Sequence, residues 1–176
     1  VKELDATVSN ASKGEYKHYM LKEIYEQPEA IQQTISQALN SDHLREDFLE
    51  SAENDFKNIQ QVQIIACGTS YHAGMIAKYW FEQIIGLSCQ VEIASEFRYR
   101  SPVIIANTLY ICISQSVETD DTLAALRDNK KLAAEKNIPI TTMTICNVAT
   151  SSMVRETDHY LLTLAGPEIG VASTKA

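Results

Sequence analysis

Short apolar runs that end in a turn and lead into a helical pattern are the feature that most constrains this fold. Residues 62–66 are mostly apolar and are followed by Cys67-Gly68-Thr69-Ser70. Apolar residues then recur at helical spacing between residues 73 and 84, and Gly86 offers a helix C-cap. Strand-like runs that alternate with helical segments predict βαβ units, and therefore a parallel sheet with helices on both faces.

The rest of the chain repeats this alternation. The pattern predicts further helices at about 119–136 and at 152–156, and further strands at 90–93, 109–113, 140–146 and 159–164. Nearly continuous apolar strands suit a sheet that is covered on both sides. We therefore expect an α/β fold, a three-layer α-β-α sandwich with a five-stranded parallel sheet in the common flavodoxin-like strand order.

The N-terminal part differs from this pattern. Residues 1–14 are polar and aperiodic and are expected to form a linker, whereas residues 15–56 are expected to form a helical N-terminal extension. Within the extension, Pro28 predicts a break between two helices, because the residue before a proline avoids the α conformation. A third helix is expected at 42–53. Residues 57–176 then form the sheet domain, and the start at Val1 suggests a piece of a longer protein.

Composition narrows the range of partners. Fifteen basic and 23 acidic residues give a formal net charge of −8, which argues against nucleic acid or an anionic membrane as the main partner. No apolar run approaches the roughly 18 residues of a membrane span, and no signal-peptide pattern is present. The four cysteines form no C-x-x-C pair, and the histidines lack zinc-type spacing. We expect a cytoplasmic protein without metal or cofactor.

Two predicted strand ends carry hydroxyl-rich turns that lead directly into helices, at residues 67–70 and 114–119. Such turns offer backbone N–H groups, the positive end of a helix dipole and hydroxyl donors, which together suit a phosphate group. Neither turn contains lysine or arginine, so the donors would be neutral and a small phosphorylated metabolite fits better than a nucleotide. The G-x-G-x-x-G and G-x-x-x-x-G-K-[ST] nucleotide motifs are also absent.

A purely structural interpretation remains open for the same residues. Ser and Thr between a strand and a helix are preferred N-caps in proteins of any function. Asp120 and Asp121 suit the first turn of a helix because its dipole favours acidic groups there. Arg98 and Arg100 could contact an anion or form surface ion pairs, and Ser173 is expected to cap a helix.

Six segments resemble the isomerising glutamine–fructose-6-phosphate aminotransferase family over nearly the whole chain beyond residue 15. They are HYMLKEIYEQP (18–28), ACGTSYHAGMIAKYWFE (66–82), VEIASEFRYR (91–100), ISQSVETDDTLAALR (113–127), TICNVATSSMVRETD (144–158) and EIGVASTKA (168–176). Members of this family carry a glutaminase domain followed by two sugar-isomerase (SIS) subdomains. The resemblance covers the inter-domain linker and the first SIS subdomain, which implies a flavodoxin-like SIS fold for residues 57–176.

The resemblance also implies sugar-phosphate-binding residues. They are Thr69 and Ser70 in one loop, Ser114, Gln115, Ser116 and Thr119 in the next, and Val171 and Ser173 near the sugar. One position departs from the family, which usually has glycine where this chain has Val117. A β-branched residue there is strained if the backbone needs a positive φ and harmless if it does not.

The family makes glucosamine 6-phosphate and glutamate from fructose 6-phosphate and glutamine. Its catalytic groups lie in the glutaminase domain and in or beyond the second SIS subdomain, so this chain is expected to contain no catalytic residue and to be inactive alone. The implied partners are the sugar phosphates, those two other domains and a second copy in a homodimer. Two rival functions remain, a non-catalytic SIS module that senses a phosphosugar and an interaction domain whose loops are only helix caps.

Overall fold

The computed structural model describes residues 12–40, 43–45, 52–115 and 120–176. The chain forms two compact units, one from Val1–Arg45 together with Thr163–Ala176 and the other from Glu46–Leu162. The described part of the chain contains no helix that combines the length and the apolar character of a membrane span.

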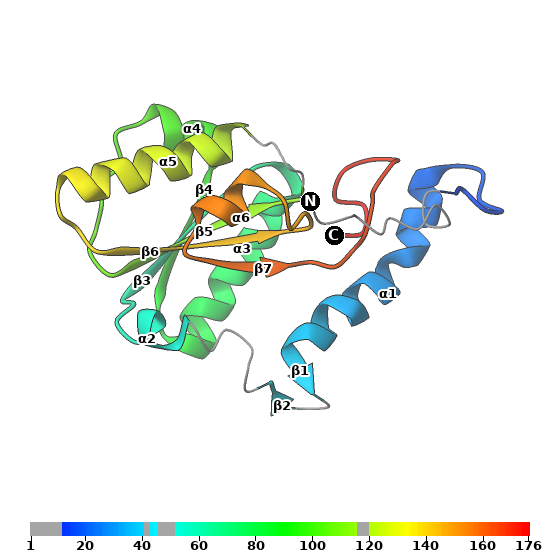
Figure 1. Ribbon diagram of the computed structural model, residues 1–176, viewed down its shortest axis with the longest axis horizontal. Coiled ribbons are helices and arrows are strands. Elements are labelled where there is room, and N and C mark those ends of the chain that lie inside the picture. Colours follow the sequence, from blue (N-terminus) through cyan, green and yellow to red (C-terminus); the bar gives the residue numbers. More distant parts are fainter. Residues whose placement is uncertain (1–11, 41–42, 46–51, 116–119) are drawn as a thin grey trace. The chain divides into compact units, whose positions relative to one another are not determined.

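The larger unit is built on a parallel sheet of five strands in the order β4-β3-β5-β6-β7 (Figure 1). The strands are β3 (Gln61–Ala66), β4 (Ser88–Ile93), β5 (Thr108–Ser114), β6 (Ile140–Cys146) and β7 (His159–Leu162). In chain order this arrangement is 2-1-3-4-5, the flavodoxin-like order. The predicted fold class and strand order are both confirmed.

Helices cover both faces of this sheet, and Figure 1 shows α4 and α5 on one side and α3 on the other. They are α2 (Glu53–Phe56), α3 (Gly68–Trp80), the π-helical turn η3 (Phe81–Ile85), α4 (Ala94–Tyr99), α5 (Asp120–Glu135) and α6 (Ser152–Glu156). Alternating strand residues divide the core in two. Ile65 and Cys112 pack in a cluster with Leu126 of α5, whereas Ile64 packs in the opposite cluster with Ala77 of α3 against it. The three-layer sandwich is therefore confirmed.

Gly74 sets how closely α3 approaches the sheet. A Cβ atom at this position would lie 3.0 Å from Cγ2 of Ile64 and 3.0 Å from Cγ1 of Val91. Helix α3 therefore packs closely on β3 and β4 because Gly74 has no side chain. At the end of this helical segment, Gly86 adopts the left-handed conformation (φ 78°), as a C-cap glycine should.

The smaller unit consists of α1 (Tyr19–Ala38), the antiparallel pair β1 (Leu39–Asn40) and β2 (His43–Leu44), and the irregular segment 163–176. The predicted break at Pro28 is wrong, because α1 continues through this residue. A proline removes only one hydrogen bond from a helix. Glu23 and Ala30 lie on one face of α1, on either side of Pro28, and both are buried. The helix predicted at 42–53 is also wrong at its start, because His43 pairs with Asn40 in a strand.

Candidate functional site

The first predicted loop joins β3 to α3 and leaves the N-terminus of α3 without a side-chain cap. The N-cap is Cys67, in an extended conformation, and its side chain makes no capping hydrogen bond. Gly68 turns the chain with a φ of +55°, which favours glycine. Thr69 and Ser70 lie within the first turn of α3 rather than at the N-cap, so neither is the capping residue that the structural interpretation required.

The side chain of Thr69 is exposed and that of Ser70 is partly exposed. The first N–H groups of a helix have no carbonyl partner within that helix, and they carry the positive end of its dipole. This turn therefore presents neutral hydrogen-bond donors beside two accessible hydroxyl groups. Such an arrangement can hold the oxygens of a phosphate group.

The second predicted loop begins at the end of β5. Ser114 is the last residue of that strand and is buried, and Gln115 follows it partly buried. Ser116 and Thr119, together with Val117, lie outside the residues that the structure describes. The chain is described again from Asp120, the first residue of α5.

The two loops start at neighbouring strand ends. In the parallel pairing of β3 with β5, Ala66 lies opposite Ile113, so that Cys67 and Ser114 are each the next residue along. From β3 the chain enters α3 on one face of the sheet, and α5, which follows β5, lies on the other face. The loops therefore flank a topological switch point, where open parallel sheets bind their ligands.

Charges near the second loop are largely paired. Asp120 and Asp121 lie in the first turn of α5, as predicted. Asp121 accepts a hydrogen bond from Nη1 of Arg98 at 3.0 Å, and this contact raises the pKa of Arg98. Arg100 binds Glu92 through two hydrogen bonds. Both arginines thus form ion pairs, the plainer of the two roles that the sequence allowed.

The two remaining predicted residues lie in the smaller unit. Val171 is exposed. Ser173 has a φ of +61°, and its backbone N–H donates to Oε2 of Glu168 at 2.8 Å. No helix is present between residues 163 and 176, so the prediction that Ser173 caps a helix is wrong. The carboxylate of Glu168 instead collects this N–H together with those of Lys175 and Ala176.

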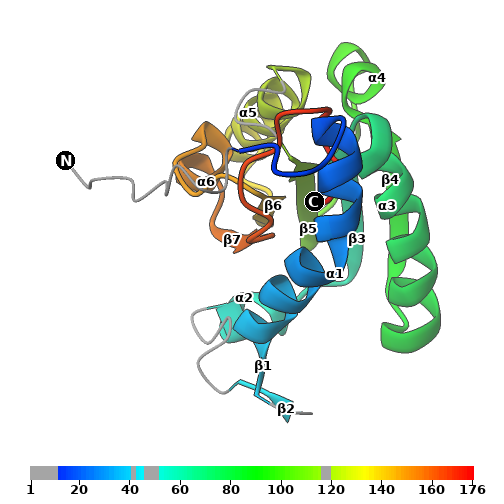
Figure 2. The ribbon, with the colours of Figure 1, turned by 90° about the vertical axis from the view of Figure 1, so that its right-hand side faces the viewer.

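Sequence reasoning missed the residue that organises this segment. Glu23 of α1 is only 3% exposed, and its Oε1 accepts hydrogen bonds from the backbone N–H groups of Ile169 and Gly170. Its Oε2 accepts a hydrogen bond from the hydroxyl of Thr174 at 2.6 Å. Figure 2 shows the C-terminal segment alongside α1. A glutamate in an amphipathic helix carries no sequence signal of a partner about 150 residues away.

No cluster of three or more His, Cys, Asp or Glu side chains that could hold a metal ion occurs in the described residues. All four cysteines are free thiols. The described part of the site offers hydroxyl and backbone N–H groups for hydrogen bonding.

The family model of the SIS domain matches residues 55–176. Over 176 residues the chain is 85% identical to glutamine–fructose-6-phosphate aminotransferase [isomerizing] of Acinetobacter baylyi, covering all of this chain and 29% of that protein. It is 56% identical over 167 residues to the enzyme of the same name from Pseudomonas putida, and this match covers 94% of this chain and 26% of that protein. The chain thus spans less than a third of these relatives.

One solved structure supports the same placement. The C-terminal domain of glucosamine-fructose-6-phosphate aminotransferase from Francisella tularensis is 52% identical, with a TM-score of 0.83. The match covers 93% of this chain and 44% of that one.

Proposed function

The chain belongs to the SIS domain family, and from this premise we propose that it is the first, sugar-phosphate-binding SIS subdomain of an isomerising glutamine–fructose-6-phosphate aminotransferase. The complete enzyme would make glucosamine 6-phosphate and glutamate from fructose 6-phosphate and glutamine. The high identity to relatives that carry this enzyme's name supports the assignment. This piece would bind the sugar phosphate and would not catalyse the reaction alone.

One observation carries the proposal, the juxtaposition of the uncapped N-terminus of α3 with the end of β5 at the switch point of the sheet. Thr69, Ser70, Ser114 and Gln115 would bind the phosphate there through hydroxyl, amide and backbone donors. Ser116 and Thr119 would complete this loop. Val171 and Ser173, on the segment held by Glu23 and Glu168, would approach the sugar.

The glutaminase domain and the second SIS subdomain would be this chain's partners in the longer protein. They would supply ammonia and the groups that move protons on the sugar. We further propose a cytoplasmic homodimer. Sedimentation of the chain across a concentration range tests self-association, and a monomer at the highest concentration would count against the dimer.

Thermal unfolding with added ligands tests the binding function. The ligands are fructose 6-phosphate, glucosamine 6-phosphate, inorganic phosphate and unphosphorylated glucosamine. A ligand at about 100 times its Kd adds about 2.7 kcal/mol to the free energy of unfolding, which raises the Tm of a chain of this size by about 5–10 °C. We expect this rise with the two sugar phosphates and none with glucosamine.

The absence of a shift with every ligand would contradict phosphosugar binding by this chain. The same scan on Val117→Gly then tests whether the departure from the family motif is responsible. Restored binding would assign the loss to Val117. If Val117→Gly also shows no Tm shift with any ligand, an interaction domain whose loops only join strands to helices would be favoured. In the longer protein, production of glucosamine 6-phosphate separates the enzyme from a non-catalytic phosphosugar sensor.

A further inference from the structure

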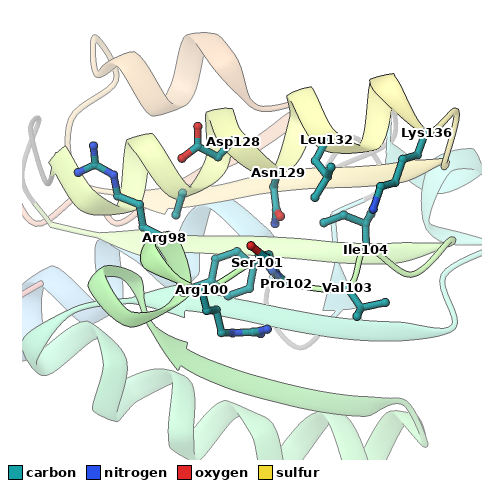
Figure 3. Close-up of a pocket in the computed structure, with 12 residues that line it drawn as sticks. Arg98, Arg100, Ser101, Pro102, Val103, Ile104, Asp128, Asn129, Leu132 and Lys136 are labelled. Atoms are coloured by element: carbon teal, nitrogen blue, oxygen red, sulfur yellow. The ribbon is translucent and has the colours of Figure 1, made fainter.

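A cavity of about 410 Å³ lies between α5 and the segment that connects α4 to β5 (Figure 3). Its two arginines are already engaged, Arg98 with Asp121 and Arg100 with Glu92. The carboxamide atoms of Asn129 are covered by their surroundings, and the other polar residues of the lining are exposed, namely Ser101, Asp128 and Lys136. Among its described lining residues, the cavity thus offers a ligand no polar group that is both sheltered and free to bind. The smaller unit carries a stronger indication of function.

Ser173 in the smaller unit has a backbone conformation that is unusual for its residue type. Three non-glycine residues of the described chain have a positive φ, and the two others are the asparagines Asn107 and Asn137. Asparagine tolerates this conformation more readily than most residues that carry a side chain. Serine lacks this tolerance, so holding Ser173 at a φ of +61° costs free energy. A glycine would relieve the strain, but it has no hydroxyl group.

The carboxylate of Glu168 stabilises this conformation. Its Oε2 accepts a hydrogen bond from the backbone N–H of Ser173 at 2.8 Å. Its Oε1 accepts from the N–H groups of Lys175 and Ala176 at 2.7 and 3.1 Å. Hydrogen bonds to an ionised carboxylate are stronger than those between neutral groups. Glu168 therefore ties down the backbone of the strained residue and of the turn that follows it.

The side chains that follow Ser173 attach the segment to α1, whereas the side chain of Ser173 does not. The hydroxyl of Thr174 donates to Oε2 of Glu23, and the ammonium group of Lys175 binds Glu26 at 2.7 Å. Within the described part of the chain, the hydroxyl of Ser173 makes no hydrogen bond, and the residue is partly exposed. This hydroxyl is therefore available to a ligand.

A strained backbone that is held firmly is typical of a functional position. We propose that Glu168 is a positioning residue for sugar binding, because its carboxylate holds residue 173 at a positive φ and so presents the Ser173 hydroxyl to the sugar of a sugar phosphate. This inference rests on the proposed function, in which Ser173 approaches the sugar. Glu168 itself would not touch the sugar, since both of its carboxylate oxygens already accept backbone N–H groups.

Isothermal titration calorimetry of the 176-residue chain with fructose 6-phosphate tests the proposal. Glu168→Gln should weaken binding by about tenfold, because the amide replaces one acceptor oxygen with an NH₂ group that faces other donors. Ser173→Ala, which removes the hydroxyl, should weaken binding by a similar factor. The matched control is Glu29→Gln, since Glu29 is exposed on α1 and its Oε1 accepts from the side chain of Gln33. This control should bind as tightly as the unmodified chain.

A double variant separates positioning from a general structural role. If Glu168 acts through the hydroxyl of Ser173, Glu168→Gln should have no further effect on affinity in the Ser173→Ala chain. Hydrogen exchange of the Ile169 and Gly170 amides, which bond to Glu23, shows whether the segment still lies on α1 in each variant. We expect these amides to stay protected. Ser173→Gly should have a higher Tm than Ser173→Ala, because glycine adopts a positive φ without strain.

Several results would overturn the proposal. Fructose 6-phosphate binding by Glu168→Gln that equals that of the unmodified chain would remove this inference alone and leave the proposed function intact. Additive losses in the double variant, or lost protection of Ile169 and Gly170 in Glu168→Gln, would assign a structural role to Glu168. Equal Tm values for Ser173→Gly and Ser173→Ala would show that residue 173 is not strained. If the unmodified chain does not bind fructose 6-phosphate, the proposed function fails and this inference fails with it.

Discussion

The carboxylate of Glu23 and the backbone of Gly170 are in direct contact, with the N–H of Gly170 donating to Oε1 at 2.9 Å. A Cβ atom on Gly170 would lie 2.8 Å from Oε2 of Glu23 and 2.6 Å from the backbone nitrogen of Met20. The close approach of the C-terminal segment to α1 therefore requires a residue without a side chain at position 170. This contact fixes the segment that carries Val171 and Ser173.

Gly170→Ala should lower the free energy of unfolding of the smaller unit by about 1–3 kcal/mol, because the added methyl group meets backbone atoms that cannot move alone. Hydrogen exchange of the Ile169 and Gly170 amides measures the loss. Gly166→Ala is the contrasting variant, since Gly166 has a positive φ and open space around its Cβ position, so its loss reports backbone strain alone. Gly170 has no positive φ, so an unchanged free energy of unfolding in Gly170→Ala would show that the contact with Met20 does not exclude a side chain.

Glu23→Gln should remove the part of the free energy of unfolding that depends on the ionised carboxylate of Glu23. Burial alone would raise the pKa of Glu23, but hydrogen bonds from Gly170, Thr174 and Ile169 outweigh burial and hold this pKa below its ordinary value. A lowered pKa in the folded state stabilises the fold above the unfolded pKa of about 4.3, and this contribution is lost as the pH falls through the folded pKa.

At pH 7 we therefore expect the wild-type chain to exceed Glu23→Gln by about 1–3 kcal/mol in free energy of unfolding, and this difference should shrink below about pH 4.3. Urea unfolding at a series of pH values measures it. Glu29→Gln serves as the control, because Glu29 is exposed on the same helix. A difference that stays constant down to pH 3 would refute the linkage to Glu23.

Thr69→Ala and Ser70→Ala should each weaken fructose 6-phosphate binding by about ten- to a hundredfold, since a hydrogen bond to a charged group contributes about 1.5–3 kcal/mol. Isothermal titration calorimetry measures the change. Ser88→Ala is the matched control, because Ser88 is exposed at the opposite, amino end of its strand. Unchanged affinity in both loop variants would remove these hydroxyls from the site.

One thiol should react much faster than the others in the native chain. Burial raises the pKa of Cys112 to about 12, and burial with the nearby charge of Glu82 raises that of Cys89 to about 11. Cys146 is also buried, whereas Cys67 is partly exposed. Because the thiolate is the reactive form, iodoacetamide at pH 8 should label Cys67 first.

Mass spectrometry of peptides from partly labelled chain identifies the fast site. In Cys67→Ser the fast phase should disappear, leaving only labelling that depends on unfolding. A second fast thiol in that variant would show that the sheet opens more readily than its buried strands indicate.

Local patterning was sufficient to predict the sheet. The strands at 140–146 and the helix at 152–156 have the predicted bounds, because apolar runs and turn residues mark both ends of each. The adjacency of the loops after β3 and β5 followed from the common strand order and is confirmed. Whether Thr69 or Ser70 caps α3 could not be decided from the sequence, because Ser and Thr suit both the N-cap and the first turn of a helix. The backbone of the folded chain decides it, since the N-cap is Cys67.

What the sequence did not predict depends on distant contacts. Pro28 was expected to break α1, but buried residues on either side of it keep the helix continuous. Glu23 and Glu168 bind backbone N–H groups, which are the same in every residue and leave no trace in the sequence.

The bonds between Glu23 and the C-terminal segment also have a consequence for the order in which the chain acquires its structure. Ile169 follows Glu23 by 146 positions. At a synthesis rate of 5–20 residues per second, about 7–30 s separate their emergence from the ribosome. Throughout that interval the Glu23 carboxylate has only water for a partner, and a 20-residue helix alone is marginally stable. Helix α1 is thus made before the strands of the sheet, but it gains its contacts with the segment at 169–174 only after all of those strands have been made.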